Sequence, residues 1–253
     1  MNNDKRINYG SAWDEIIEAY FIDMIKFLPD ISAGIDLELP YELLNDDFEQ
    51  MTRYVEFNQG YTSKLVRVWL NQQEEEWMMI HLQVQGGYFE ELPSKMYKIN
   101  YGVFERYGKH PYPLVILCDD DKNWRPKQFS LGHKEFGSYI EFSFQNLKLL
   151  DFNSKKRWKE LEASTNPFAN VIMAHLQAQN TKQAPLERKV WKTKLTHRLY
   201  EKAFLEQDVR NLYKFIDTAL VLPEPLEQEF WEELKQFESE RDVTYITMES
   251  ACD

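Results

Sequence analysis

The chain contains only two cysteines, Cys118 and Cys252, and they lie far apart among its 253 residues. This count excludes a disulfide framework and the paired cysteines of a zinc site. Long apolar runs are also missing: no stretch approaches the roughly 20 residues that a membrane-spanning helix needs, and the segment MNNDKRINYG lacks the apolar part of a signal peptide. We therefore expect a cytoplasmic protein with no membrane partner.

Basic residues are fewer than acidic residues. The chain has 30 Lys and Arg against 42 Asp and Glu, a net charge of -12. This balance argues against a surface coated in basic residues for indiscriminate nucleic-acid binding, although it is compatible with a local basic surface. Hydrophobic residues make up 43% and aromatic residues 15% of the chain, which indicates a well-packed core that folds without metal or disulfide support.

Residues 61–85 read YTSKLVRVWLNQQEEEWMMIHLQVQ, which predicts two apolar strands joined by a polar hairpin loop. Side chains alternate between the two faces of a strand. One face of the second strand carries Met78, Ile80, Leu82 and Val84, and the other carries Trp77, Met79, His81, Gln83 and Gln85. The increasing polarity toward Gln85 predicts a strand that runs from a packed interior into a cleft. Antiparallel pairing brings the residues near Ser63 close to those near Gln83.

The rest of the chain supplies the other elements of an α/β core. We expect a first helix capped by Ser11 and ending before Pro29, a short helical turn at 46–51, a helix at 90–107, and strands at 112–118, 138–144 and 147–152. From Ser154 onward the pattern is helical, with helices opening at Asn166-Pro167, near Leu186, near Asp208 and after Pro223. The predicted organisation is a core with mixed strand pairing at 1–152, a helical region at 153–240 packed on that core, and a tail at 241–253.

The predicted helix near 186–204 carries two rows of basic side chains at i,i+4 spacing. They are Arg188 and Lys192 in one row, and Lys194, Arg198 and Lys202 in the other. Such rows can track phosphates. In a chain of this acidity a solvated helix face is the favoured interpretation.

Several segments, taken together and in order, resemble one protein family. They are KLVRVWL, EEWMMIHLQVQ, FERYG, NWRP, RWKELEASTNPFANVIMAHL and NLYKFIDTALVLPE. They are similar to segments of the recombination-promoting nuclease / putative transposase family, a branch of the PD-(D/E)XK nuclease superfamily, over Trp13 to Ile246. The resemblance implies a restriction-endonuclease-like core, with a mixed central sheet flanked by helices, and an all-α C-terminal extension. It also implies a Mg²⁺-dependent DNA endonuclease associated with recombination and mobile elements.

The resemblance places the family's catalytic positions on the hairpin. The family has an aspartate just before the first strand and Glu-x-Gln at the end of the second, and these positions are Ser63, Gln83 and Gln85 here, of which only Gln85 matches. An upstream acidic pair of the family falls on Asn45 and Asp47. Other acids of the family are retained at Glu15, Glu18 and Asp36.

These substitutions bear on the metal, because Mg²⁺ prefers anionic oxygens and normally needs one or two carboxylates besides the substrate phosphate. Ser63 and Gln83 offer neutral oxygens. We expect impaired or lost cleavage, hence a pseudonuclease that retains binding to DNA or to a protein. The alternative is an active endonuclease, with Mg²⁺ as its cofactor, whose rearranged metal site uses Asp47, Glu15 or Glu18.

The same residues also admit plainer interpretations. Gln83 and Gln85 are typical of hydrogen-bonding amides on a strand face, and His81 of a packed, hydrogen-bonded histidine. Ser63 has no histidine and aspartate partners in its motif, so the sequence gives no support for a serine hydrolase. If DNA is bound, the expected contacts near the cleft are Arg67, Lys95, Lys98 and Arg106.

Overall fold

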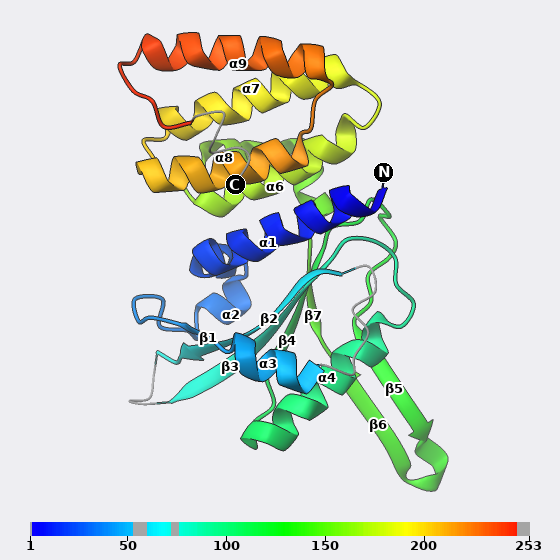
Figure 1. Ribbon diagram of the computed structural model, residues 1–253. Coiled ribbons are helices and arrows are strands. Elements are labelled where there is room, and N and C mark those ends of the chain that lie inside the picture. Colours follow the sequence, from blue (N-terminus) through cyan, green and yellow to red (C-terminus); the bar gives the residue numbers. More distant parts are fainter. Residues whose placement is uncertain (1, 53–59, 72–75, 247–253) are drawn as a thin grey trace. The chain divides into compact units, whose positions relative to one another are not determined.

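The computed structural model describes residues 2–52, 60–71 and 76–246, and Figure 1 labels its elements. The chain divides into two units: a mixed unit of residues 24–150, and a helical unit of residues 1–23 together with 151–253. This division differs from the predicted 1–152 core chiefly in the first helix, most of which groups with the helical region. The centre of the predicted hairpin loop and the end of the predicted tail lie outside the described residues.

The mixed unit is built on a five-stranded sheet with the strand order β1-β2-β3-β4-β7. Its strands are β1 (Glu42–Leu43), β2 (Gly60–Trp69), β3 (Trp77–Gln85), β4 (Tyr112–Leu117) and β7 (Gln145–Lys148). The pairs β1/β2 and β2/β3 are antiparallel, whereas β3/β4 and β4/β7 are parallel. Helix α4 (Leu92–Tyr107) connects β3 to the parallel β4. The predicted α/β class and the mixed pairing are therefore confirmed.

Strand β3 is covered on both faces, which corrects the prediction of a strand that opens into a cleft. Gln83 and Gln85 have no exposed surface, and neither do the apolar Ile80 and Val84 of the opposite face. The helices α3 (Asn45–Thr52) and α4 contribute the side chains that cover the glutamine-bearing face. One apolar cluster there contains Leu44, Phe48, Leu65, Met79, Ile99 and Val103. The polar end of β3 consequently lies beneath a helical layer.

Helix α4 has the terminal residues that its boundaries need. Pro93 occupies its first turn, where a missing N–H is not required, and Gly108 follows its end with φ 67°, a left-handed conformation that glycine adopts without steric cost. The predicted helix at 90–107 is therefore confirmed. The helical turn predicted at 46–51 is confirmed as the slightly longer α3, and a short α2 (Pro29–Ser32), which was not predicted, precedes it.

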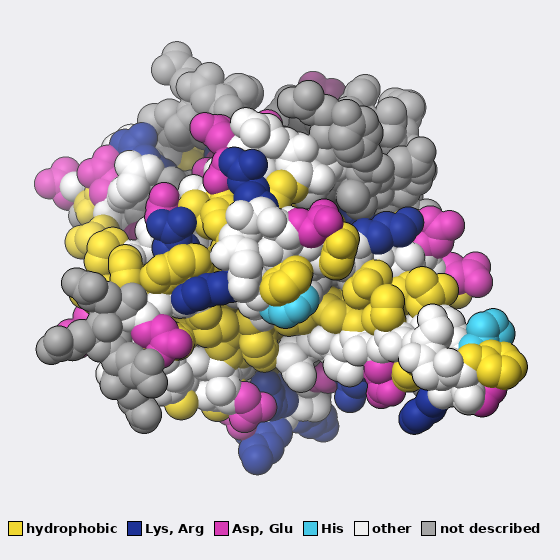
Figure 2. All heavy atoms as spheres, turned by 90° about the horizontal axis from the view of Figure 1, so that it is seen from below, with side chains coloured by type: hydrophobic (Ala, Val, Ile, Leu, Met, Phe, Trp, Pro, Cys, Tyr) yellow, Lys and Arg dark blue, Asp and Glu magenta, His cyan; other side chains and the backbone are white. Residues whose placement is uncertain are grey.

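A two-stranded hairpin projects from the mixed unit (Figure 1). It consists of β5 (Gln128–His133), a 3₁₀ turn η1 (Lys134–Phe136) and β6 (Ser138–Ser143). At its base Phe129 and Phe142 pack on Tyr97 of α4, with ring centroids 5.1 and 5.8 Å away. Figure 2 shows hydrophobic side chains gathered over the face formed by α4 and this hairpin. Exposed apolar residues of that region are Tyr101, Phe104, Leu131, Phe136, Tyr139 and Ile140.

The strand predicted at 147–152 is wrong in its extent. The chain leaves the sheet after Lys148 and forms the 3₁₀ segment η2 (Leu149–Asn153). Leu149 and Phe152 are both buried at a spacing of three residues, the period of a 3₁₀ turn. A short apolar run does not distinguish this period from that of a strand.

Over its described residues, the helical unit contains most of α1 (Asn2–Ile25) and five further helices. These are α5 (Lys155–Ala163), α6 (Pro167–Asn180), α7 (Pro185–Glu201), α8 (Glu206–Ala219) and α9 (Glu224–Ser239). Asn166 caps α6 by accepting the Phe168 N–H at 2.8 Å, as its Asn-Pro sequence predicts. The cap predicted at Ser11 is wrong, because α1 continues upstream: Tyr9 packs on Trp13, one turn later. Among the described residues, no helix is long and apolar enough to cross a membrane.

Candidate functional site

The hairpin register confirms the predicted proximity of Ser63 and Gln83, which are directly opposite each other on β2 and β3. The Ser63 hydroxyl lies 3.1 Å from Nε2 of His81. Burial, and secondarily the charge of Lys95, lowers the pKa of His81 to about 3. The imidazole is therefore neutral at physiological pH, and neither residue brings a charge to this end of the sheet.

A β-bulge distorts β2 at the same place. Gly60 is opposite Gln85 and Thr62 is opposite Val84, so that Tyr61 is the extra residue. Bulges are frequent next to functional sites, where they redirect a side chain. The Tyr61 ring lies so close to Gly86 that a Cβ added there would be 2.5 Å from its Cζ. Gly86 is therefore required for this position of the tyrosine.

The two glutamines use their amide groups on the local backbone. Nε2 of Gln83 donates to the carbonyl oxygen of Val84 at 3.1 Å, and Nε2 of Gln85 donates to that of Gly87 at 2.9 Å. The Oε1 atom of Gln83 is buried and has no hydrogen-bond partner in the part of the chain that the structure describes. Buried polar atoms are nearly always hydrogen-bonded, so this acceptor is an exception.

A cavity of about 250 Å³ lies between α3 and this end of the hairpin. The described residues that line it are Phe48, Glu49, Thr52, Tyr61, Thr62, Ser63 and Gln83. Glu49 was not predicted from the sequence, and it supplies the one carboxylate among the described residues of this lining.

Asp36 lies away from this cavity. Its N–H donates to the carbonyl oxygen of Trp69 at 2.9 Å, and its carboxylate accepts the N–H of Glu38 at 3.0 Å. Trp69 is at the far end of β2, six residues from Ser63, which corresponds to about 20 Å along a strand at about 3.3 Å per residue. The structure therefore does not bring Asp36 together with Ser63 and Gln83.

Asp47 is engaged elsewhere as well. Its carboxylate accepts hydrogen bonds from the Tyr107 hydroxyl and the Arg106 guanidinium, both from α4. These two contacts, in that order of size, lower the pKa of Asp47. The side chain ties α3 to α4 and is not among the described residues that line the cavity.

Glu15 and Glu18 belong to α1 in the helical unit. They line a cavity of about 350 Å³ between α1 and α8, together with Asn211 and Lys214. Glu15 forms an ion pair of 3.2 Å with Lys214. Within the helical unit, the other polar side chains that line this cavity are therefore the amide of Asn211 and the ammonium group of Lys214.

The four expected DNA contacts differ in their surroundings. Arg67 pairs with Glu42 at 2.7 Å, and Arg106 pairs with Asp47. Lys95 is only 4% exposed, and burial lowers its pKa to about 8, so contact of its ammonium group with a phosphate is disfavoured. Lys98 is exposed on α4 and has no ion pair among the described residues.

The residues at the end of the hairpin do not fit Mg²⁺. They offer a serine hydroxyl, a glutamine amide and one exposed carboxylate, Glu49, whereas the ion is usually held by one or two carboxylates in octahedral geometry and keeps several waters. In the part of the chain that the structure describes, no group of three or more His, Cys, Asp or Glu side chains is placed to hold a metal ion.

The carboxyl ends of β4 and β7 carry a buried ion pair. The Lys148 ammonium lies 2.5 Å from Oδ1 of Asp119 and donates to the Trp124 carbonyl oxygen at 3.2 Å. Its side chain has no exposed surface, and that of Asp119 is 6% exposed. The preceding Cys118 is buried, and burial raises the pKa of its thiol, so a reactive thiolate is disfavoured there.

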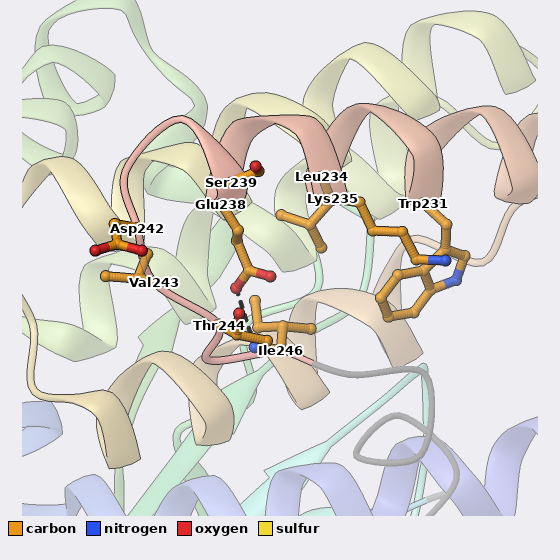
Figure 3. Close-up of a pocket in the computed structure, with 9 residues that line it drawn as sticks. All are labelled: Trp231, Leu234, Lys235, Glu238, Ser239, Asp242, Val243, Thr244 and Ile246. Atoms are coloured by element: carbon orange, nitrogen blue, oxygen red, sulfur yellow. Dashed lines mark hydrogen bonds between the residues drawn. The ribbon is translucent and has the colours of Figure 1, made fainter.

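Another cavity, of about 480 Å³, lies beside α9 and the segment that follows it (Figure 3). Glu238 points toward this segment, and its Oε1 accepts the N–H groups of Tyr245 and Ile246 at 2.9 and 3.1 Å. The Tyr200 hydroxyl donates to the same oxygen at 2.5 Å. Glu238 thus holds part of the predicted tail against the helices, which is a structural role.

Two basic residues of α7 are buried. The Lys192 ammonium contacts Asp217 at 2.5 Å and Glu227 at 2.8 Å. Arg198 donates to Oδ1 of Asn170 at 2.9 Å and to three backbone carbonyl oxygens. The interpretation of the basic rows as a solvated face is therefore wrong for these two residues, and neither presents its charge to a phosphate.

Comparisons of the chain with protein-family models, with curated proteins and with solved structures gave no match. The functional argument consequently depends on the residues and geometry described above.

Proposed function

We propose that the chain is a PD-(D/E)XK-type nuclease-fold protein of the recombination-promoting nuclease / putative transposase family, with impaired or lost metal-dependent DNA cleavage. The mixed sheet and the order of helix, strand, strand, helix and strand support this assignment. The bulged hairpin end beneath α3 and α4 corresponds to the family's catalytic region. In this proposal the protein retains the fold for binding DNA or a protein.

One observation carries the proposal: the two family acid positions on the hairpin are occupied by neutral side chains that are directly opposite each other. Ser63 contacts the neutral His81. Asp36 and Asp47, the nearest candidates for compensation in sequence, are held by other partners. In a metal-dependent nuclease, activation of water and stabilisation of phosphate charge both require a bound metal ion. The oxygen atoms of Ser63, Gln83 and Glu49 do not favour the binding of Mg²⁺.

A cleavage assay tests the proposal. Supercoiled plasmid is incubated with the purified chain and Mg²⁺ or Mn²⁺, and with the double variant Ser63→Asp, Gln83→Glu. We expect no metal-dependent nicking by the wild type and a gain of nicking by the double variant, provided that circular dichroism shows both to be folded. Nicking by the wild type that is lost in Glu49→Gln would instead establish the alternative, an active endonuclease with a rearranged metal site.

DNA binding is tested separately by the dependence of affinity on salt. Each phosphate contact contributes a slope of about 0.9 in log K against log salt. If α4 contacts DNA, Lys98→Ala reduces this slope by about 0.9, while Lys155→Ala, on the exposed start of α5, is the control and leaves it unchanged. Absence of a salt-dependent interaction would leave a protein partner as the binding function.

A further inference from the structure

The cavity between α3 and the hairpin end is lined by residues that carry oxygen atoms alongside a larger apolar surface. Glu49 contributes a carboxylate, Gln83 an amide oxygen, and Ser63, Thr52 and Thr62 contribute hydroxyl groups. The described residues of this lining include no Lys, Arg or His side chain. Glu49 is exposed and has no ion pair among the described residues. The electrostatics of this cavity therefore favour a cation over a phosphate or another anion.

A second observation indicates that the cavity takes a hydrogen-bond donor. Gln83 has no exposed surface, and its Oε1 has no hydrogen-bond partner among the described residues. Its Nε2 is directed to the Val84 carbonyl oxygen, so Oε1 is the unpartnered acceptor on a residue that lines the cavity. Because buried acceptors are rarely left without a donor, the cavity matches a group that brings N–H bonds as well as positive charge.

We infer that this cavity binds a guanidinium or primary ammonium group. Such a group supplies several N–H donors to neutral oxygens and pairs with a single carboxylate. The cavity, at about 250 Å³, is smaller than the about 300–1,000 Å³ of sites for larger ligands. It therefore holds one basic group, supplied either by a side chain of a protein partner or by a free amine. The inference goes beyond the proposed function, because it depends on the lining alone.

The test uses the full chain and methylguanidinium as the probe. Its binding is followed by NMR from the backbone amide of Ser63 and the side-chain amide of Gln83. We expect saturable shifts with methylguanidinium, and at least tenfold weaker binding of tetramethylammonium, which has the same charge and no N–H. Absence of saturable shifts, or equal binding of the two cations, would overturn the inference.

Matched variants locate the contacts. We expect Glu49→Gln to weaken methylguanidinium binding at least fivefold, whereas Glu90→Gln, which removes an exposed charge outside the cavity, leaves it unchanged. Gln83→Leu should weaken binding at least fivefold; because it also removes the Nε2 donor to the Val84 carbonyl oxygen, its binding is measured under conditions where circular dichroism shows the variant to be folded. Equal losses in Glu49→Gln and Glu90→Gln would mean a general charge effect and would refute the site.

Two further ligands distinguish the source of the basic group. A capped Gly-Arg-Gly peptide represents the side chain of a protein partner, and 4-aminobutylguanidine represents a free amine. Tighter binding of the peptide assigns the cavity to a protein partner, and tighter binding of the amine assigns it to a small molecule. If methylguanidinium binds and neither larger ligand does, the cavity is closed to natural sources and the inference fails. None of these measurements involves DNA or a divalent metal, so their failure is distinguishable from failure of the cleavage proposal.

Discussion

Replacing Lys192 with methionine tests how much a buried cation stabilises the helical unit. The Lys192 side chain is 1% exposed, and its ammonium lies 2.5 Å from Asp217 and 2.8 Å from Glu227. It also lies 4.7 Å from the centre of the Phe230 ring. The lysine thereby joins α7 to α8 and to α9. Methionine has an unbranched side chain of similar length and carries no charge.

The structure sets the expected magnitude. Removing one partner of a buried ion pair costs about 3–5 kcal/mol, because a charge remains without compensation. Asp217 and Glu227 are 25% and 29% exposed, so water can solvate them, and the loss should be near the lower end, about 3 kcal/mol. Lys189, on the same helix, provides a matched control. It also contacts two carboxylates, those of Glu229 and Glu233, but these are 57% and 50% exposed, so Lys189→Met should cost at most about 1 kcal/mol.

Urea denaturation followed by circular dichroism measures both variants. With a slope of about 3 kcal/mol per molar urea, Lys192→Met should lower the midpoint by roughly 1 M, and Lys189→Met by less than a third of this. Amide hydrogen exchange in α7 shows whether the loss of stability in Lys192→Met affects the helical unit. Equal shifts in the two variants would refute the reasoning, because burial would then not determine the strength of these contacts.

Three further predictions, which use four substitutions, address the mixed unit, and urea denaturation measures each. Gly86→Ala should cost about 1–3 kcal/mol, because the added Cβ collides with the Tyr61 ring. Gly102→Ala, inside α4 with open space around it, is the control and should stabilise by about 0.5–1 kcal/mol. The reverse order of stability would contradict the packing at Gly86. Asp119→Asn should cost about 3–5 kcal/mol by leaving the buried Lys148 ammonium without a charged partner, and a loss below about 1 kcal/mol would count against this pair. Burial lowers the pKa of Lys95 to about 8, below its unfolded value of about 10.4, so between these values the unfolded chain binds more protons and stability rises with pH. Over this pH interval the free energy of unfolding of the wild type should gain about 3 kcal/mol from Lys95, and Lys95→Met should lack this gain. Parallel pH profiles of the two proteins would contradict the prediction.

Local sequence signals were sufficient for most of the elements. Asn166-Pro167 identified the start of α6, and alternation in residues 77–85 identified β3. These signals act within a few residues, so they appear in the sequence itself. Strand β5 was missed although its equally exposed partner β6 was predicted; the β5 segment contains Gly132, and glycine is depleted in strands.

The burial of polar groups was the least predictable feature. Lys192 and Arg198 have the spacing of a solvated helix row, yet both are buried. Their partners, Asp217 and Asn170, lie 25 and 28 residues away in the chain. Periodicity identifies which residues share a helix face, but it does not reveal which face receives a carboxylate from another helix. Gln83 and Gln85 were misjudged for the same reason, because α3 and α4 cover a strand face that looks polar in the sequence.

The candidate site depends on which end of a strand each residue reaches. Asp36 and Asp47 are both acids upstream of the hairpin, and neither contributes to the cavity, since one meets the far end of β2 and the other contacts α4. Glu49, two residues after Asp47, lines it. On a helix, two residues correspond to a rotation of about 200° at 3.6 residues per turn, so adjacent acids face opposite sides. Position within a helical turn thus determines which carboxylate lines the cavity with Gln83, and the comparison of Glu49→Gln with Glu90→Gln separates the proposed cation binding at this cavity from an effect of net charge.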